Sequence, residues 1–218
     1  MENKVMELKH VNVYYREGRK KKQVLEDISF SVYEGEIVGL AGESGSGKST
    51  LCKCALGLLK EYDGEILHYT KRPQMIFQDP YKSLNPRKKV GWILEEPLKL
   101  ERKYIKTQRR EAVEEMLSKV HLPEEFYDKY PRELSGGQRQ RISIALALLT
   151  GTKLILADEP LSALDVTVQA QMIRLLRELQ EKERIAYLFV SHDLDVISML
   201  CSRVLFLKDR KVTEYENL

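Results

Sequence analysis

The apolar positions near the start of the chain are spaced first as in strands and then as in a helix. Leu8–Tyr15 and Val24–Val32 are rich in β-branched and aromatic residues, and the charged, glycine-containing segment between them predicts a loop connecting two paired strands. A short apolar run at Glu36–Ala41 leads directly into the glycine-rich sequence GESGSGKST. Apolar residues then recur at helical spacing, so we expect a strand, a loop and a helix. These helical positions are Leu51, Cys54, Ala55, Leu58 and Leu59.

Between about residues 79 and 132 the pattern changes to helical stretches separated by prolines. Prolines stand at positions 80, 86, 97, 123 and 131. One stretch carries its apolar residues on a single helical face, which predicts an amphipathic helix. We expect a small helical lobe with Trp92 in its core, and a contact between Trp92 and a partner protein is the alternative. The apolar face consists of Ala112, Val113, Met116, Leu117 and Val120.

From Ser135 onward the pattern predicts helices and strands in alternation. Such alternation favours a mostly parallel sheet with helices on both faces, which is an α/β fold. A length of 218 residues suits one domain with a smaller inserted lobe. The predicted elements are a helix to Leu149, a strand at Lys153–Ala157, a helix at about Thr167–Lys182, a strand at Ile185–Val190, a helix from Asp193 and a strand at Val204–Leu207.

Composition describes an ordinary folded protein, with 43% hydrophobic and 32% charged residues. No apolar run reaches the roughly 18 to 20 residues that span a bilayer, and the first ten residues lack the apolar core of a signal peptide. We therefore expect a protein that stays in the cytosol. Cys52, Cys54 and Cys201 lack the paired spacing of a zinc site or a disulfide framework, so we expect reduced thiols.

The formal net charge of +3 does not by itself indicate nucleic-acid binding. One local run of basic residues nevertheless stands out between the first two predicted strands. We expect this run to form a solvated hairpin tip, and contact with anionic lipid headgroups is the alternative. The run contains Arg16, Arg19, Lys20, Lys21 and Lys22.

The glycine-rich sequence matches the phosphate-binding pattern G-x-x-x-x-G-K-[ST], and it lies between a predicted strand and a predicted helix, as that pattern requires. Its glycines allow the backbone N–H groups to surround phosphate oxygens, and the helix N-terminus adds positive potential. We expect Lys48 to reach the β- and γ-phosphates and Ser49 to bind Mg²⁺. The expected ATP contacts are Gly42, Glu43, Ser44, Gly45, Ser46, Gly47, Lys48, Ser49 and Thr50.

Two acidic residues follow a second short apolar run. Leu154–Ala157 is typical of a strand buried on both faces, and it ends in Asp158 and Glu159. Ligands of open parallel sheets bind at the carboxyl ends of the strands, so both acids should face the phosphate loop. We expect Asp158 to hold Mg²⁺ and Glu159 to polarise the attacking water. Without the phosphate loop, two exposed acids at a strand end would be an equal alternative.

With these motifs in place, Leu134–Gln138 (LSGGQ) resembles the signature of the ATP-binding domain of ABC transporters. The resemblance implies one ABC ATPase domain over residues 1–218. This domain would have a P-loop NTPase core, an N-terminal antiparallel β subdomain and a helical subdomain at about residues 79–135 that includes the signature. We expect a helix beginning near Gln138, with an N-terminus suited to bind an anion. The resemblance implies that the turn before it closes over the γ-phosphate held by a second subunit. The expected contacts of this turn are Ser135, Gly136, Gly137 and Gln138.

Four further positions are similar to functional positions of that family. Tyr15 corresponds to an aromatic residue that stacks on adenine, and a core tyrosine is the alternative. Gln78 corresponds to a glutamine that senses Mg²⁺ and the attacking water, and His192 to a histidine that contacts the γ-phosphate. Asp165 ends the segment SALD, which in the family crosses to the opposite subunit. We expect the remaining histidines to be surface residues, and these are His10, His68 and His121.

The segment Phe77–Arg87 (FQDPYKSLNPR) resembles the branch of the family that imports oligopeptides, dipeptides and nickel. The resemblance implies a peripheral subunit on the cytoplasmic face of the cell membrane that energises import of peptides, nickel or metal chelates. Its expected partners are a second ATPase subunit, related or identical, in a head-to-tail dimer, two permeases and an extracytoplasmic binding protein, with no nucleic acid. The alternative is a soluble ABC-type ATPase of DNA repair or translation, but the region between Lys48 and Glu133 lacks the heptads of a coiled-coil insertion.

Overall fold

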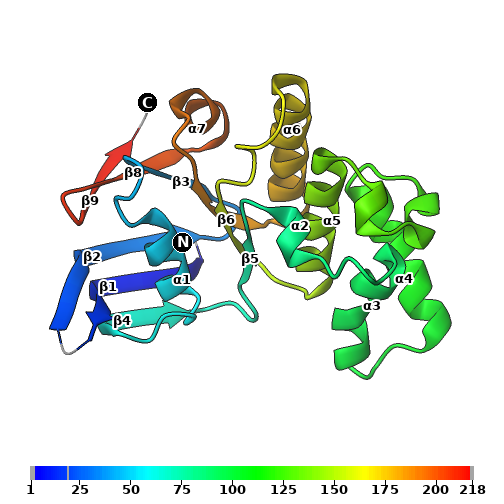
Figure 1. Ribbon diagram of the computed structural model, residues 1–218, viewed down its shortest axis with the longest axis horizontal. Coiled ribbons are helices and arrows are strands. Elements are labelled where there is room, and N and C mark those ends of the chain that lie inside the picture. Colours follow the sequence, from blue (N-terminus) through cyan, green and yellow to red (C-terminus); the bar gives the residue numbers. More distant parts are fainter. Residues whose placement is uncertain (1–2, 19, 217–218) are drawn as a thin grey trace.

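Two β-sheets and a group of helices beside them make up the computed structural model, which describes residues 3–18 and 20–216 (Figure 1). An antiparallel sheet has the order β2-β1-β4, from β1 (Lys4–Glu17), β2 (Lys20–Tyr33) and β4 (Tyr62–His68). The second sheet has the order β5-β6-β7-β3-β8-β9. Its strands are β3 (Ile37–Ala41), β5 (Gln74–Ile76), β6 (Leu154–Asp158), β7 (Ala186–Val190), β8 (Arg203–Lys208) and β9 (Lys211–Glu216).

All neighbours in the second sheet pair in parallel except β8 and β9, which pair antiparallel. The predicted α/β fold with a mostly parallel sheet is therefore confirmed. β4 and β9 were not predicted, because β4 is short of buried positions and β9 lies at an exposed edge of the sheet.

Alternating residues of the central strands pack into two different hydrophobic cores. In β6, Leu154 and Leu156 pack with α1 (Lys48–Ala55) and with the antiparallel sheet. Ile155 and Ala157, on the other face, pack with the helices of the opposite layer. Because successive side chains of a strand point to opposite faces, a strand buried on both sides needs a continuous apolar run. The sequence LILA meets this requirement.

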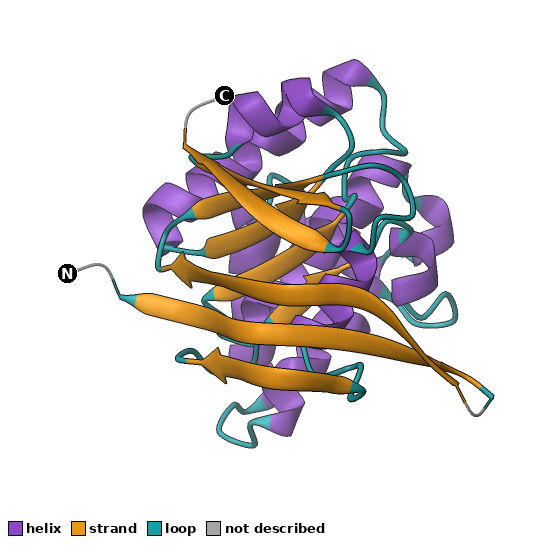
Figure 2. Ribbon diagram, turned by 90° about the vertical axis from the view of Figure 1, so that its left-hand side faces the viewer, coloured by secondary structure: helices purple, strands orange, loops and turns teal. Residues whose placement is uncertain are grey.

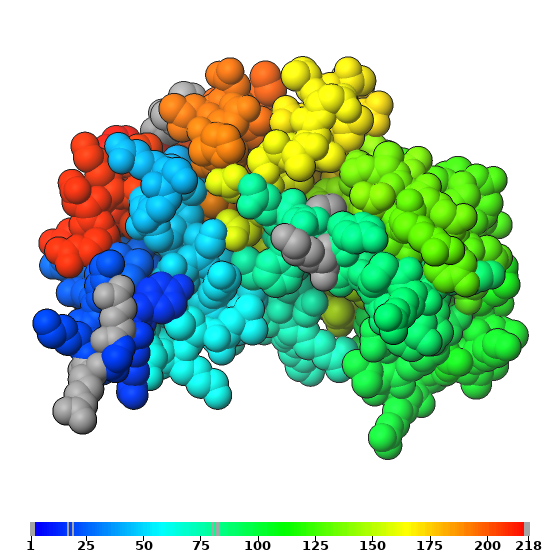
Figure 3. Space-filling view, in the orientation of Figure 1, coloured from blue at the N-terminus to red at the C-terminus, as the bar shows by residue number. Residues whose placement is uncertain are grey.

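The remaining helices cover the second face of the parallel sheet and extend beyond it. Figure 1 shows α6 and α7 above the sheet, with α2 to α5 gathered on one side. In the space-filling view of Figure 3 these green helices form a block, and the surface is indented at its lower edge between them and the cyan segment. The helix bounds are α2 (Pro80–Ser83), α3 (Val90–Leu100), α4 (Lys106–Lys119), α5 (Gly136–Leu149), α6 (Val166–Glu183) and α7 (Leu194–Leu200), with 3-10 turns at Glu124–Asp128 and Pro131–Glu133.

Trp92 lies at the surface, so the expectation that it fills the core of the helical lobe is wrong. Its side chain is 40% exposed, and the ammonium groups of Lys88 and Lys99 lie 4.7 and 5.3 Å from its ring centroid. Tyr127, which is partly buried, packs its ring directly on the neighbouring Gly91, where a Cβ atom would lie 2.5 Å from three ring atoms.

Three predicted boundaries also differ from the structure. The two strands pair as predicted, but they continue to Glu17 and resume at Lys20, so the connecting loop is shorter than the predicted one. Figure 2 shows this hairpin extending beyond the body of the molecule. Arg19, within the basic run, lies outside the described residues. α1 ends at Ala55, and Leu58 is 64% exposed. α5 begins at Gly136, two residues before the predicted start.

Other expectations hold for the part of the chain that the structure describes. His10, His68 and His121 are exposed, and the three cysteines are unpaired. None of the helices in residues 3–18 and 20–216 is long and apolar enough to span a bilayer.

The first turn of α5 packs very closely against α6. A Cβ atom at Gly137 would lie 2.5 Å from Val168 Cγ1, whereas one at Gly136 would meet Leu164 Cδ2 at 3.4 Å, an ordinary contact. Both glycines have helical rather than left-handed backbone, so packing distance, not backbone conformation, distinguishes them. The contact between these two helices therefore requires glycine at position 137.

Gly137→Ala should destabilise the folded chain, because the added methyl group must displace the β-branched Val168. We expect a loss of about 1–3 kcal/mol in the free energy of unfolding, measured by urea denaturation. Gly136→Ala is the matched control, with an expected change within about 0.5 kcal/mol. Equal stabilities of the two variants would show that this contact does not restrict residue 137.

Candidate functional site

The phosphate loop joins β3 to α1 and folds around its own lysine. Lys48 is only 6% exposed, and its Nζ donates hydrogen bonds of 2.8 Å to the carbonyl oxygens of Gly42 and Glu43. A side chain at Gly42 would collide with the main chain, since its Cβ would lie 2.5 Å from the Leu207 carbonyl oxygen. The first turn of α1 contains no acidic residue, so the positive end of the helix is not neutralised there. This loop is suited to hold an anion.

A carboxylate and a hydroxyl meet at the end of the loop. Ser49 Oγ donates a 3.0 Å hydrogen bond to Oδ1 of Asp158, the last residue of β6. Burial raises the pKa of the Asp158 carboxyl above its ordinary value, although the hydrogen bond from Ser49 acts in the opposite direction. A buried carboxylate gains stability from a nearby cation.

These two groups fit Mg²⁺, which prefers oxygen ligands and keeps several waters. Within the described ranges, no group of three or more His, Cys, Asp or Glu residues could hold a metal ion without other ligands. A magnesium ion here would therefore also need oxygens from phosphate or water, as is usual where it binds together with a nucleotide.

Glu159 is the point at which three separate segments meet. Its Oε2 lies 3.4 Å from Nε2 of Gln78, which follows β5, and 3.3 Å from Nδ1 of His192, which follows β7. Its own N–H donates a 3.1 Å hydrogen bond to the Val190 carbonyl. The φ angle of Glu159 is 48°, a left-handed conformation that is uncommon for residues other than glycine. This backbone conformation and three neighbours define where the carboxylate lies.

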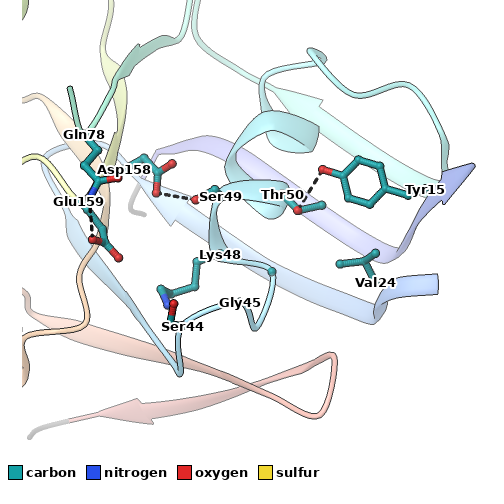
Figure 4. A pocket seen from close by; sticks show the side chains of 11 residues that line it. Tyr15, Val24, Ser44, Gly45, Lys48, Ser49, Thr50, Gln78, Asp158 and Glu159 are labelled. Atoms are coloured by element: carbon teal, nitrogen blue, oxygen red, sulfur yellow. Dashed lines mark hydrogen bonds between the residues drawn. The ribbon is translucent and has the colours of Figure 1, made fainter. Parts of the chain in front are cut away.

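The far end of the site is aromatic. Tyr15 of β1 is 39% exposed, and its hydroxyl lies 3.2 Å from Thr50 Oγ1 (Figure 4). Val24 of β2 lies beside it. Tyr15 is thus not a core tyrosine, and its ring is accessible to a ligand.

One cavity of about 460 Å³ connects these groups, from the aromatic end to the acidic end. A volume of this size suits a small organic ligand. The polar and charged groups gather at one end, whereas Tyr15 and Val24 form the other, as a nucleotide with a phosphate chain and a base requires. The residues lining it are Tyr15, Val24, Ser44, Gly45, Gly47, Lys48, Ser49, Thr50, Gln78, Asp158 and Glu159.

The signature turn is built as a helix cap and does not line this cavity. Ser135 Oγ accepts from the N–H of Gln138 at 3.3 Å, and Gln138 Oε1 accepts from the N–H of Ser135 at 2.9 Å. Asp165 likewise caps α6, with its carboxylate accepting from the Val168 N–H at 3.0 Å. Most of the residues expected at the phosphates and the base thus line one cavity, whereas Gly42, Glu43 and Ser46 of the loop do not, and His192 is connected to it through Glu159. Residues 135–138 lie elsewhere, where Gly136 and Gly137 approach Leu164 and Val168, on either side of Asp165 in the sequence.

Two contributors were not among the predicted site residues. Ser162 Oγ lies 3.3 Å from Gln78 Nε2 and donates to the Glu159 carbonyl oxygen at 3.1 Å. Val24 lines the aromatic end. Ser162 follows Glu159 by three residues, so the turn expected after the strand could have indicated it as a site residue. Val24 reaches the cavity through the pairing of β2 with β1, and the spacing of apolar residues does not predict that pairing.

Comparisons with known proteins agree with this geometry. A family model described as ABC transporter matches residues 25–162. The oligopeptide transport ATP-binding protein OppF of Bacillus subtilis is 41% identical over 221 residues, which cover 94% of this chain and 72% of that protein. AppF, an oligopeptide transport ATP-binding protein of the same organism, is 44% identical over 223 residues, covering 92% and 68%.

A solved structure has the same fold over almost its whole length. It is a dimeric ATP-binding cassette in a post-hydrolysis state bound to ADP and Pi, with a TM-score of 0.84 and 30% identity, covering 97% of this chain and 98% of that one. Family match, relatives and site geometry lead to the same conclusion: the chain belongs to the ABC transporter family, as an ATP-binding subunit that hydrolyses ATP.

Proposed function

We propose that the cavity of about 460 Å³ binds ATP with its phosphates at the loop 42–50 and its base against Tyr15. The support is the separation of the lining into a polar end, where Lys48 and the two carboxylates lie, and an aromatic end. Lys48 would exchange its two carbonyl partners for phosphate oxygens, and the unneutralised end of α1 would add to this attraction. Stacking on Tyr15 places the base without hydrogen bonds to its edge.

Ser49 and Asp158 would hold Mg²⁺, which when bound neutralises charge on the β- and γ-phosphates. Their 3.0 Å contact and the burial of Asp158 support this assignment. Gln78 lines the same end of the cavity and would complete the set through its amide oxygen.

Glu159 would orient the attacking water in line with the γ-phosphate, and one observation carries this proposal. The Glu159 carboxylate is contacted by Gln78, which follows β5, and by His192, which follows β7, and these two strands flank β6 at the acidic end of the cavity. A carboxylate held in this way can accept a hydrogen bond from water and direct its lone pair. Hydrolysis then yields ADP and Pi, and His192 is placed to donate to an oxygen of the transferred phosphoryl group.

A second ATPase subunit, identical or related, would complete each site in a head-to-tail dimer. Ser135–Gln138 form a capped helix N-terminus, which is a phosphate-binding structure, yet they lie outside the cavity of their own chain. The solved cassette at 30% identity is dimeric. We infer that this turn, with Asp165 beside it, closes over the nucleotide of the neighbouring subunit. We also propose that residues 79–135, which contain α2 to α4, act as a helical subdomain of the single domain 1–218.

The transported substrate is an oligopeptide in this proposal. The relatives at 41% and 44% identity are named oligopeptide transport ATP-binding proteins, and the segment Phe77–Arg87 resembles the same branch. We place the chain on the cytoplasmic face of the membrane with two permeases and an extracytoplasmic binding protein. Nickel or a metal chelate is the second candidate for the cargo.

Glu159→Gln should abolish most ATP hydrolysis while leaving ATP binding intact. A positioned base contributes about two to four orders of magnitude, and the amide cannot take a proton from water. The measurement is ATPase rate together with the amount of ATP retained after gel filtration of the complex isolated with the tagged chain. Turnover near that of the unchanged chain would remove Glu159 from this role.

Ser135→Arg in one subunit of a mixed dimer should impair the site that contains the partner's phosphate loop. The arginine side chain would occupy the space over the γ-phosphate bound by the partner, whereas the mutated subunit's own phosphate loop is unaltered. Crosslinking of photoreactive ATP to the two differently tagged subunits measures nucleotide binding at each site separately. Damage confined to the mutated subunit's own loop would contradict the shared site.

Affinity purification of the tagged chain from its native membrane should recover two permeases and a second ATPase. A peptide-binding protein in the same complex, and peptide-stimulated ATP hydrolysis, would identify the cargo, with nickel chelates as the comparison ligands. Recovery with ribosomes or DNA instead would contradict the transporter assignment.

A further inference from the structure

Gln140 is a buried amide without a partner. It lies on α5 one turn after the signature residues and is 1% exposed, yet neither Oε1 nor Nε2 makes a hydrogen bond within the described ranges. Buried side-chain amides are normally satisfied, and one that is not destabilises the state in which it occurs. The nucleotide-free conformation is therefore less stable than it would be with an apolar side chain of the same length at this position.

Gln140 also lines a second cavity, of about 540 Å³, between three functional segments. Its lining includes Gly136 and Gln140 of α5, and Pro160, Ala163 and Leu164 of the turn formed by residues 160–164. Gln78 contributes to this cavity as well as to the nucleotide cavity. The two cavities are thus neighbours that share the glutamine contacting Glu159.

The turn 160–164 is joined to Glu159 both by the chain and by hydrogen bonds. It begins directly after Glu159, whose carbonyl oxygen accepts from both the N–H and the hydroxyl of Ser162, at 3.3 and 3.1 Å. The same hydroxyl lies 3.3 Å from Gln78 Nε2. Any contact that shifts or fixes this turn therefore changes the surroundings of Glu159 in the same chain.

We propose that Gln140 is a positioning residue whose amide hydrogen-bonds the main chain of the turn 160–164 when ATP closes two subunits together. The inference rests on the proposed shared site. α5 starts at the signature turn that would contact the partner's nucleotide, and Gln140 on the same helix faces the turn beside its own Glu159. Occupancy of one ATP site is thereby transmitted to the hydrolytic carboxylate of the other. An amide offers both a donor and an acceptor, as pairing with main-chain groups requires.

Gln140→Met tests the resting state, because methionine has the same length and no group that needs a partner. We expect the melting temperature of the nucleotide-free chain to rise by about 2–4 °C. The matched control is Gln169→Met, since Gln169 Nε2 donates to the Leu161 carbonyl at 3.1 Å and its loss should lower the melting temperature. A fall in both variants would show that the Gln140 amide already has a partner, such as water, and would overturn the proposal.

Turnover of the complex isolated from the membrane tests the closed state. Gln140→Met should lower kcat roughly three- to tenfold, the loss of one hydrogen bond, with KM for ATP unchanged. A Gln140→Met variant with a higher melting temperature and a lower kcat cannot owe its lost activity to structural damage. An unchanged kcat would overturn the inference, whereas full turnover of Glu159→Gln would instead overturn the proposed function on which it rests.

Discussion

The parallel hydrogen bonding of β3, β7 and β6 determines where the chemistry of this protein takes place. Val38 and Leu156 both lie opposite Leu188, so the three strands advance together and end at one edge of the sheet. The phosphate loop, the acidic pair and His192 each follow one of these strands. Residues from distant parts of the sequence meet because their strands share a register, and the buried apolar runs that precede them keep that register in place.

Burial at this end of the sheet removes charged groups from water, and ATP with a cation can supply the opposite charges that these groups then lack. Lys48 is nearly inaccessible and, among the described residues, donates to the carbonyl oxygens of Gly42 and Glu43, and Asp158 is a partly buried carboxyl with a raised pKa. Opposite charges separated across a small cavity are well suited to a ligand that carries phosphate oxygens next to a divalent ion. Glu159, by contrast, is held by neighbouring side chains and by its backbone conformation, which would suit the proposed role of directing a water molecule.

Motif spacing allowed the α/β fold and most of the residues that line the candidate cavity to be predicted, because both depend on local sequence. The apolar run before Asp158 and the glycines before Lys48 each define their surroundings within ten residues. Elsewhere, tertiary contacts decided the outcome. Trp92 was expected inside the helical lobe, but the ring of Tyr127, from a distant 3-10 turn, occupies the space beside Gly91. The start of α5 was misjudged because two glycines suggest a loop, whereas the Ser135–Gln138 capping pair and the close contact with Val168 make them helical.

The carbonyl partners of Lys48 have a consequence for the speed of the ATPase cycle. An ammonium group that waits in water must lose its hydration shell whenever phosphate arrives and regain it whenever product leaves. Here two of the three N–H groups of Lys48 already donate to the carbonyl oxygens of Gly42 and Glu43, so in the proposed nucleotide complex phosphate oxygens would replace carbonyl oxygens rather than water. In that mode of binding, neither nucleotide binding nor product release would require Lys48 to exchange a full hydration shell, and each turnover would cost correspondingly less desolvation.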